Sequence, residues 1–133
     1  MSDFRVIITG GRKRESEADY GTMEDIIERL DYDGFEIPHL VIIQGGCPTG
    51  IDSLAREVAE EYGTRMESFP ADWKEHGRAA GPIRNQAMAD AGADLCLAFP
   101  SAGRSTGTWD MIRRACAAGI ETRIYPEASH DVA

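Results

Sequence analysis

The stretch that decides the fold is Leu40-Val-Ile-Ile-Gln-Gly-Gly-Cys-Pro-Thr-Gly-Ile-Asp52, an apolar run that breaks into glycines and then opens a helix. Residues 41–43 are β-branched, which is typical of a strand covered on both faces of a parallel sheet. Apolar residues then recur at helical spacing over residues 51–62, which predicts a helix of about three turns. A strand, a glycine turn and a helix N-terminus together present free N–H groups to an anion. Gly45 and Gly46 therefore favour a phosphate-bearing ligand, although a tight turn alone also explains them.

The rest of the chain alternates predicted strands with amphipathic helices. Strands are predicted at residues 4–9, 65–69, 93–99 and 121–125, and further helices at 23–30, 82–91 and 109–116. Thr22 is the expected N-cap of the first helix, after a polar loop at 13–20. A second loop is expected at 71–80, and Pro82 then opens the next helix. This alternation predicts an α/β fold with a parallel sheet and helices on both of its faces.

Length and composition restrict the class of protein. A chain of 133 residues has the size of one domain, which we expect to span residues 1–126, followed by a polar tail at 127–133. The net charge of −9 argues against binding of duplex DNA or RNA but allows a small nucleotide. No apolar run approaches the ~20 residues that a membrane span requires. Three widely spaced cysteines, Cys47, Cys96 and Cys116, are typical of reduced thiols in a cytoplasmic protein.

Three predicted strands end in glycine-rich turns, at Gly10-Gly11, at Gly45-Gly46 and at residues 103–108. The carboxyl ends of parallel strands meet at one edge of the sheet, where ligands of such folds bind. The recurrence of the pattern therefore predicts a single ligand site at this edge. No motif calls for a cofactor or a metal ion, and the oligomeric state is left open, with a homodimer as one alternative.

Arg84 and Asn85 lie in the first turn of the helix that Pro82 opens. An arginine there opposes the helix dipole unless an anion lies opposite, and its guanidinium matches phosphate. The alternative for Arg84 is a salt bridge to Asp52 or Asp110. For Asp52 itself, contact with ribose hydroxyls and a structural role at the start of its helix are equally consistent with the sequence.

The loop after the fourth strand combines glycines with hydroxyls. Gly103, Ser105, Thr106, Gly107 and Thr108 offer N–H and O–H groups around a compact anion. The loop is not a P-loop, because no Gly-Lys-Ser/Thr follows. Helix capping by Ser105 or Thr106 is the structural alternative, and both roles are compatible.

Five further side chains are functional candidates, and three of them also have a structural interpretation. Arg12 and Arg104 are candidate anion contacts, or are solvated. Trp73 either stacks on a base or folds its loop onto the core. His76 is a candidate acid or base. Cys47 at the glycine turn is a candidate nucleophile, which would require a histidine partner.

One set of motifs extends along most of the chain: Val6-Ile-Ile-Thr-Gly-Gly-Arg12, Gln44-Gly-Gly46, Gly50-Ile-Asp52, Ala71-Asp-Trp73, Ala80-Gly-Pro-Ile-Arg-Asn85, Ala98-Phe-Pro100 and Gly107-Thr108. Together these motifs resemble the YspA-type branch of the SLOG superfamily, which also contains the lonely-guy phosphoribohydrolases and DprA-like proteins. The resemblance covers residues 4–125. It implies a Rossmann-like three-layer α/β/α sandwich with a mostly parallel five-strand sheet that binds a nucleotide or a nucleotide-derived ligand. It also implies that the protein is bacterial or from a phage, and that the pocket is lined by Gly45, Gly46, Asp52, Arg84, Asn85, Gly107 and Thr108.

The chain departs from the lonely-guy enzymes at their catalytic motif. Those enzymes carry Pro-Gly-Gly-x-Gly-Thr followed by two adjacent glutamates, the second of which acts in cleavage of the N-glycosidic bond. Aligning Gly107-Thr108 with that motif puts Asp110 and Met111 at the two acidic positions. We therefore expect ligand binding in a sensor or carrier role. The alternatives are a nucleoside 5′-monophosphate phosphoribohydrolase that uses Asp110, and an interaction module with a vestigial pocket.

Overall fold

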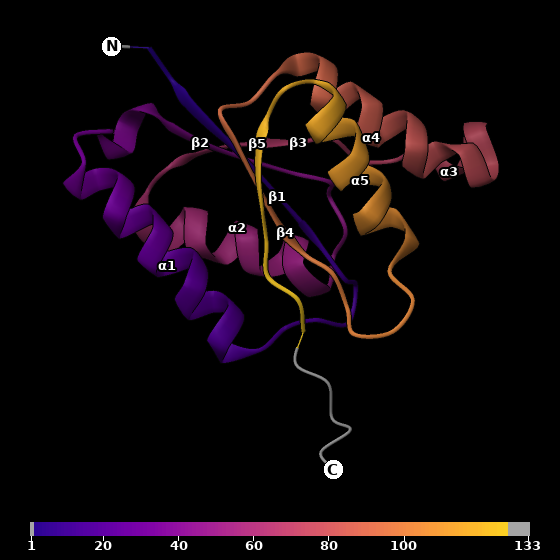
Figure 1. Ribbon diagram of the computed structural model, residues 1–133, viewed down its shortest axis with the longest axis horizontal. Helices are drawn as coiled ribbons and strands as arrows, with labels where there is room; N and C mark the ends of the chain where they lie inside the picture. The colour runs from indigo at the N-terminus through magenta and orange to yellow at the C-terminus, as the bar shows by residue number, and fades with distance from the viewer. Residues whose placement is uncertain (1, 128–133) are drawn as a thin grey trace.

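A five-stranded sheet, parallel throughout, forms the centre of the computed structural model, which describes residues 2–127 (Figure 1). Its strand order is β3-β2-β1-β4-β5. This order reverses between β1 and β4, the place where open α/β sheets bind ligands beyond the strand ends. The Rossmann-like α/β fold is thereby confirmed. The strands are β1 (Phe4–Gly10), β2 (Leu40–Gln44), β3 (Arg65–Ser68), β4 (Leu95–Phe99) and β5 (Glu121–Ile124).

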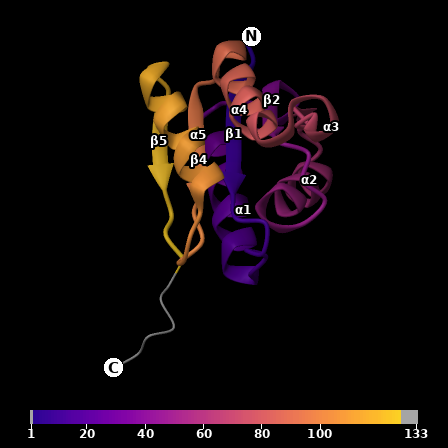
Figure 2. The ribbon, with the colours of Figure 1, turned by 90° about the vertical axis from the view of Figure 1, so that its right-hand side faces the viewer.

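Helices on both faces of the sheet connect the strands. The α-helices are α1 (Glu17–Tyr32), α2 (Gly50–Tyr62), α3 (Trp73–His76), α4 (Ala80–Ala91) and α5 (Thr106–Ala117), and the 3₁₀ helices are η1 (Ile37–His39) and η2 (Gly77–Ala79). Figure 2 shows β1 and β5 running in the same direction, so that the chain leaves β5 at the end of the sheet opposite to the start of β1. The turns that follow β1, β2 and β4 therefore lie at one edge.

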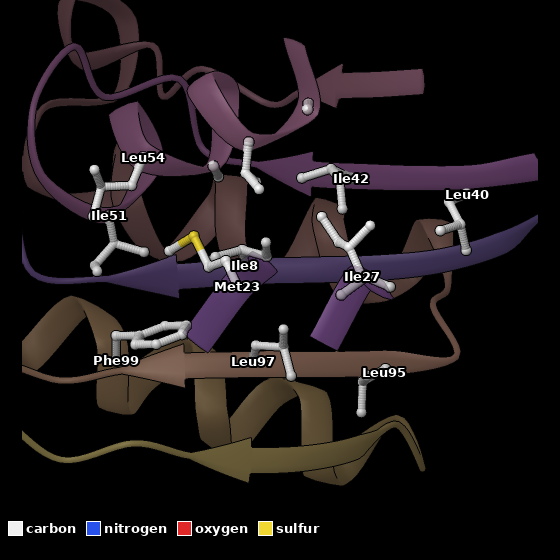
Figure 3. Close-up of a cluster of buried hydrophobic side chains, with 14 residues drawn as sticks. Ile8, Met23, Ile27, Leu40, Ile42, Ile51, Leu54, Leu95, Leu97 and Phe99 are labelled. Atoms are coloured by element: carbon white, nitrogen blue, oxygen red, sulfur yellow. The ribbon is translucent and has the colours of Figure 1, made fainter. Parts of the chain in front are cut away.

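The core has two layers because successive residues of a strand point to opposite faces. Val6 and Ile8 of β1 join a buried cluster with residues of α1 and α2, part of which Figure 3 shows. Ile7 joins a second cluster with Met88 of α4 and Met111 of α5. All residues of β2 and β4 are buried, as the apolar runs in their sequences predict. This rigid sheet holds the turns at its carboxyl edge in place.

Two predicted loops are partly helical. The helix α1 begins at Glu17 with Ser16 as its N-cap, whose hydroxyl accepts from the Asp19 N–H, so the expectation of Thr22 as the cap was wrong. Thr22 donates its hydroxyl to the Ala18 carbonyl inside the helix. The sequence predicts a loop for the first turn of α1 because the residue that this turn buries, Asp19, is charged and gives no apolar periodicity. The expected loop at 71–80 contains α3 and η2.

The segment after β5 continues in the direction of the strand, beside the end of β4. The Tyr125 N–H bonds to Ala98 O, and the Glu127 N–H bonds to Pro100 O at 3.3 Å. Of the polar tail expected at 127–133, only Glu127 belongs to the described residues, and residues 128–133 lie outside them. No helix within residues 2–127 is long and apolar enough to cross a membrane.

Candidate functional site

Glycines at the carboxyl edge allow the turns after β1 and β2 to touch. A Cβ on Gly50 would lie 2.2 Å from the Gly11 carbonyl oxygen, and Gly50 has φ +71°. A Cβ on Gly10 would lie 2.4 Å from Ile51 Cγ1, and one on Gly11 would meet the Ser101 side chain. These positions therefore require glycine for packing between loops, whether or not a ligand is present.

The N-terminus of α2, where the sequence suggested a phosphate, is occupied by the protein's own groups. The Gly50 N–H donates to the Glu15 carboxylate, and the Ile51 N–H donates to Gly11 O at 3.2 Å. The Thr49 hydroxyl donates to Arg12 O at 2.8 Å. The β1–α1 loop thus caps this helix, and the N–H groups of Gly50 and Ile51 are not available to a phosphate.

The buried Asp52 carboxylate is hydrogen-bonded to the backbone of the glycine turn. One of its carboxylate oxygens accepts from the Cys47 N–H at 3.0 Å, and the residue is 9% exposed. Burial raises the pKa of Asp52, against the opposing effects of the Cys47 N–H and of the nearby Arg84 charge. The structure therefore shows a structural role for Asp52 at the start of α2, and contact of this residue with ribose hydroxyls stays a prediction.

Arg84 reaches from α4 to the end of β2. Its Nη1 donates to Gly45 O at 2.7 Å, and its Nε donates to Asn85 Oδ1 at 2.9 Å. A Cβ on Gly45 would lie 2.3 Å from Nη1, so the glycine makes room for the guanidinium. Burial lowers the pKa of Arg84. Within residues 2–127 no carboxylate oxygen lies within the 4.0 Å of a salt bridge, so neither of the ion pairs considered for Arg84 forms.

Asn85 joins α4 to the start of α5. Its Nδ2 donates to Gly107 O at 3.2 Å and to Asp110 Oδ2 at 3.0 Å. Together with the bond from Arg84, this makes a continuous hydrogen-bonded path from Gly45 to Gly107. The expected convergence of these loops at one edge is present in the structure, and Asn85 is buried within it.

The loop before α5 is shaped by its hydroxyls. Ser105 Oγ accepts from the Ser101 N–H and donates to Thr108 Oγ1, both at 3.1 Å. Ser105 is the N-cap residue, but its side chain makes no capping bond. Among the described residues, no acceptor pairs with the N–H groups of the first three helical residues, 106–108. In contrast to α2, this helix therefore presents free donors at the edge.

Arg12 and Trp73 meet although they are far apart in the sequence. The Arg12 guanidinium carbon lies 5.4 Å from the centroid of the Trp73 ring, a cation–π distance. The ring is 49% exposed, and a Cβ on Gly81 would lie 3.3 Å from it. Arg12 is also close enough to lower the pKa of Arg84, after burial and against the Asp52 charge. The indole thus borders the same edge as Arg84.

Asp110 lies between α4 and α5 and is already paired. Its carboxylate accepts from Arg114 Nε at 2.9 Å, from Arg113 Nη2 at 3.4 Å and from Asn85. Burial raises the pKa of Asp110, but the bonds from Arg114 and Asn85 outweigh it and hold the pKa below its usual value. These partners keep the carboxylate ionised, which does not suit a proton donor.

The remaining candidate residues, Arg104, Gly103, Gly46, His76 and Cys47, do not belong to the hydrogen-bonded path from Gly45 to Gly107. Arg104 Nε donates to Thr106 Oγ1 at 3.3 Å, and Gly103 has open space around it. A Cβ on Gly46 would lie 3.3 Å from Pro70, and the Gly46 N–H is bonded to the Gln44 side chain. His76 is exposed on α3, and Cys47 Sγ lies 3.7 Å from Thr49 Oγ1.

Sequence reasoning missed Arg14, a buried residue in the supposed polar loop. Its guanidinium pairs with Asp19 through two bonds of 2.8 Å and donates to the carbonyls of Pro100 and Tyr125. Arg14 thereby ties the β1–α1 loop to the ends of β4 and β5. Its sequence neighbours are charged, so no local signal separates it from a solvated arginine.

Comparison with known proteins gives two matches. The family model described as YspA, cpYpsA-related SLOG family matches residues 4–76. The chain is also 40% identical over 124 residues to "Gene 61 protein" of Mycobacterium phage D29, which covers 87% of this chain and 91% of the relative. The matched family segment includes the β2–α2 turn and Trp73, while Arg84 and the α5 loop lie beyond it.

Proposed function

Because the chain belongs to the YspA, cpYpsA-related SLOG family, we propose that it binds a nucleotide or nucleotide-derived ligand at the carboxyl edge of its sheet, in a sensor or carrier role. Membership of the SLOG family suggests a nucleotide-related ligand. The single observation that carries the proposal for this chain is the state of Arg84, a half-buried cation at the edge that forms no salt bridge within residues 2–127.

A half-buried guanidinium without a salt bridge is costly, because its charge has lost water and its hydrogen bonds go to neutral oxygens. Arg84 is in this state, since its acceptors are Gly45 O, Phe69 O and the Asn85 amide oxygen, and the Asp52 charge acts on it without a salt bridge. An anion at the edge would offset the desolvation and restore the pKa that burial lowers. A ligand phosphate supplies this charge with the geometry that arginine prefers.

The free donors of α5 provide a second contact for the same phosphate or for a neighbouring one. The N–H groups of residues 106–108 have no acceptor within the described chain, and the helix dipole adds partial positive charge there. The exposed Trp73 ring is the proposed platform for a base, which would take the place of the Arg12 guanidinium. The second oxygen of Asp52 is the proposed acceptor for a sugar hydroxyl.

Binding is tested by native mass spectrometry of the purified protein and by thermal shifts with a panel of nucleotides, since a ligand raises apparent stability by mass action. For the nucleotide with the largest shift, we expect Arg84→Ala to weaken binding by about 1.5–3 kcal/mol, roughly 10- to 150-fold. The control is Arg29→Ala, which removes an equal charge from an exposed pair on α1. An unchanged dissociation constant in Arg84→Ala would remove this residue from the site.

The purified protein also distinguishes ligand binding from the two alternative functions, a phosphoribohydrolase and an interaction module. Release of free base from a nucleoside monophosphate, abolished by Asp110→Asn, would replace the binding role by a phosphoribohydrolase activity. The bonds that already occupy Asp110 lead us to expect no release. Absence of a thermal shift with every nucleotide would favour a vestigial pocket.

A further inference from the structure

We propose that Glu127 is a built-in competitor for the anion-binding loop of α5, so that an anionic ligand binds more tightly when this carboxylate is removed. Glu127 Oε1 accepts from the Ala102 N–H at 3.0 Å, in the loop that connects β4 to α5. The loop already holds a carboxylate, which is the protein's own. This inference rests on the proposed function, because it concerns regulation of the same site.

The segment that carries Glu127 is held firmly against the loop. The Tyr125 ring stacks on Phe99 with centroids 5.0 Å apart, and Arg14 donates to Tyr125 O. The Glu127 N–H is bonded to Pro100 O at 3.3 Å. The backbone at Glu127 is therefore fixed beside the loop, and its side chain alone has to rotate for the Ala102 N–H to become free.

Hydrogen bonds of the loop connect the Glu127 carboxylate to the first turn of α5, where the free donors lie. Ala102 follows Ser101, whose N–H bonds to Ser105 Oγ, and Ser105 Oγ bonds in turn to Thr108 Oγ1, each at 3.1 Å. This path of hydrogen bonds connects Glu127 to the first turn of α5, and at physiological salt charges near a surface act on each other across roughly one Debye length, about 8 Å. At that range two negative charges repel each other appreciably, even near the surface.

Two effects of Glu127 therefore act in the same direction. Its charge repels an anion at the start of α5, and its oxygen occupies an N–H that the loop could otherwise donate to the ligand. Glutamine at this position keeps an acceptor for the Ala102 N–H but carries no charge. The Glu127→Gln variant thus preserves the loop while relieving the repulsion.

The test compares wild type, Glu127→Gln and a control, Glu121→Gln, with inorganic phosphate and adenosine 5′-monophosphate as probes. Glu121 is exposed at the start of β5, so its replacement removes the same charge at the opposite end of the strand. Titration calorimetry is expected to give about 3- to 10-fold tighter binding in Glu127→Gln and no change in the control. The difference should shrink in 1 M salt, where the Debye length is about 3 Å.

The outcomes separate this inference from the proposed function. Equal or weaker binding by Glu127→Gln, with binding retained by wild type, overturns the competitor role and leaves the proposed function intact. Absence of binding of both probes in wild type and in Glu127→Gln overturns both. An NMR titration adds an independent readout: phosphate should shift the Ala102 amide resonance of wild type, and an unmoved resonance on saturation contradicts displacement.

Discussion

Replacing Arg14 with methionine should destabilise the protein by about 3–5 kcal/mol, the usual cost of removing one partner of a buried ion pair. The side chains of Arg14 and Asp19 are 5% and 10% exposed, and two bonds of 2.8 Å join them. Methionine matches the length of the arginine stem but leaves the Asp19 carboxylate buried without a counter-charge. The carbonyls of Pro100 and Tyr125 lose a donor as well.

Urea unfolding measures the change, read from the midpoint and the slope of the transition. The control is Arg29→Met, which breaks the exposed pair of Arg29 with Asp33 and should change stability by less than about 1 kcal/mol. A double variant, Arg14→Met with Asp19→Leu, removes both buried charges and should recover most of the loss, because apolar replacement of a whole buried pair is often neutral.

Two results would refute this reasoning about Arg14. A loss below about 1 kcal/mol in Arg14→Met would mean that water reaches the pair and screens it. A double variant as unstable as the single one would mean that the loss comes from the carbonyls of Pro100 and Tyr125 rather than from the stranded Asp19. Either result would mean that the Arg14–Asp19 ion pair is not what stabilises the contact between the β1–α1 loop and the ends of β4 and β5.

Two further predictions concern the β2–α2 turn. Gly50 and Gly63 both have φ +71°, but of the two only Gly50 would place a Cβ against backbone atoms. In urea unfolding, Gly63→Ala should therefore lower the free energy of unfolding by about 1–2 kcal/mol, and Gly50→Ala by at least about 3 kcal/mol. Equal losses would show that the backbone around Gly50 moves to accommodate the Cβ. Burial raises the pKa of Asp52 above its ordinary value of 3.8, so the folded state binds the proton more tightly and loses stability as pH rises through the window above 3.8. Asp52→Asn should therefore abolish the contribution of this carboxyl to the decrease in the free energy of unfolding between pH 4 and 7. Parallel pH profiles of the free energy of unfolding in the two proteins would contradict the raised pKa of Asp52.

Local patterns were sufficient for the sheet and for most helices. The β-branched run at 41–43 predicts a strand that proves buried on both faces, and the helical stripe that follows predicts α2. These patterns are reliable because periodicity records which side of an element faces the core. The glycine turns also predict a common edge, since parallel strands end together, and the path from Gly45 to Gly107 lies there.

Other features depend on residues that are far apart in the sequence. The first turn of α1 carries Asp19, which forms a buried ion pair with Arg14, and both residues look solvated in isolation. Likewise, Glu15 caps α2, a helix that begins 35 residues later. A charged residue gives the same local signal in solvent and in a buried pair, so its neighbours in sequence do not reveal which state it adopts.

The sequence by itself determined the alternation of strands and helices, the parallel sheet and the edge at which the glycine turns gather, because hydrophobic periodicity and turn chemistry are local properties. Only the tertiary structure decided which N–H groups at that edge are free, that Arg84 forms no salt bridge within the described residues, and that Glu127 reaches Ala102. Hydrogen bonds and charge pairs depend on distances of about 3 Å between atoms. The packing of the whole chain sets those distances.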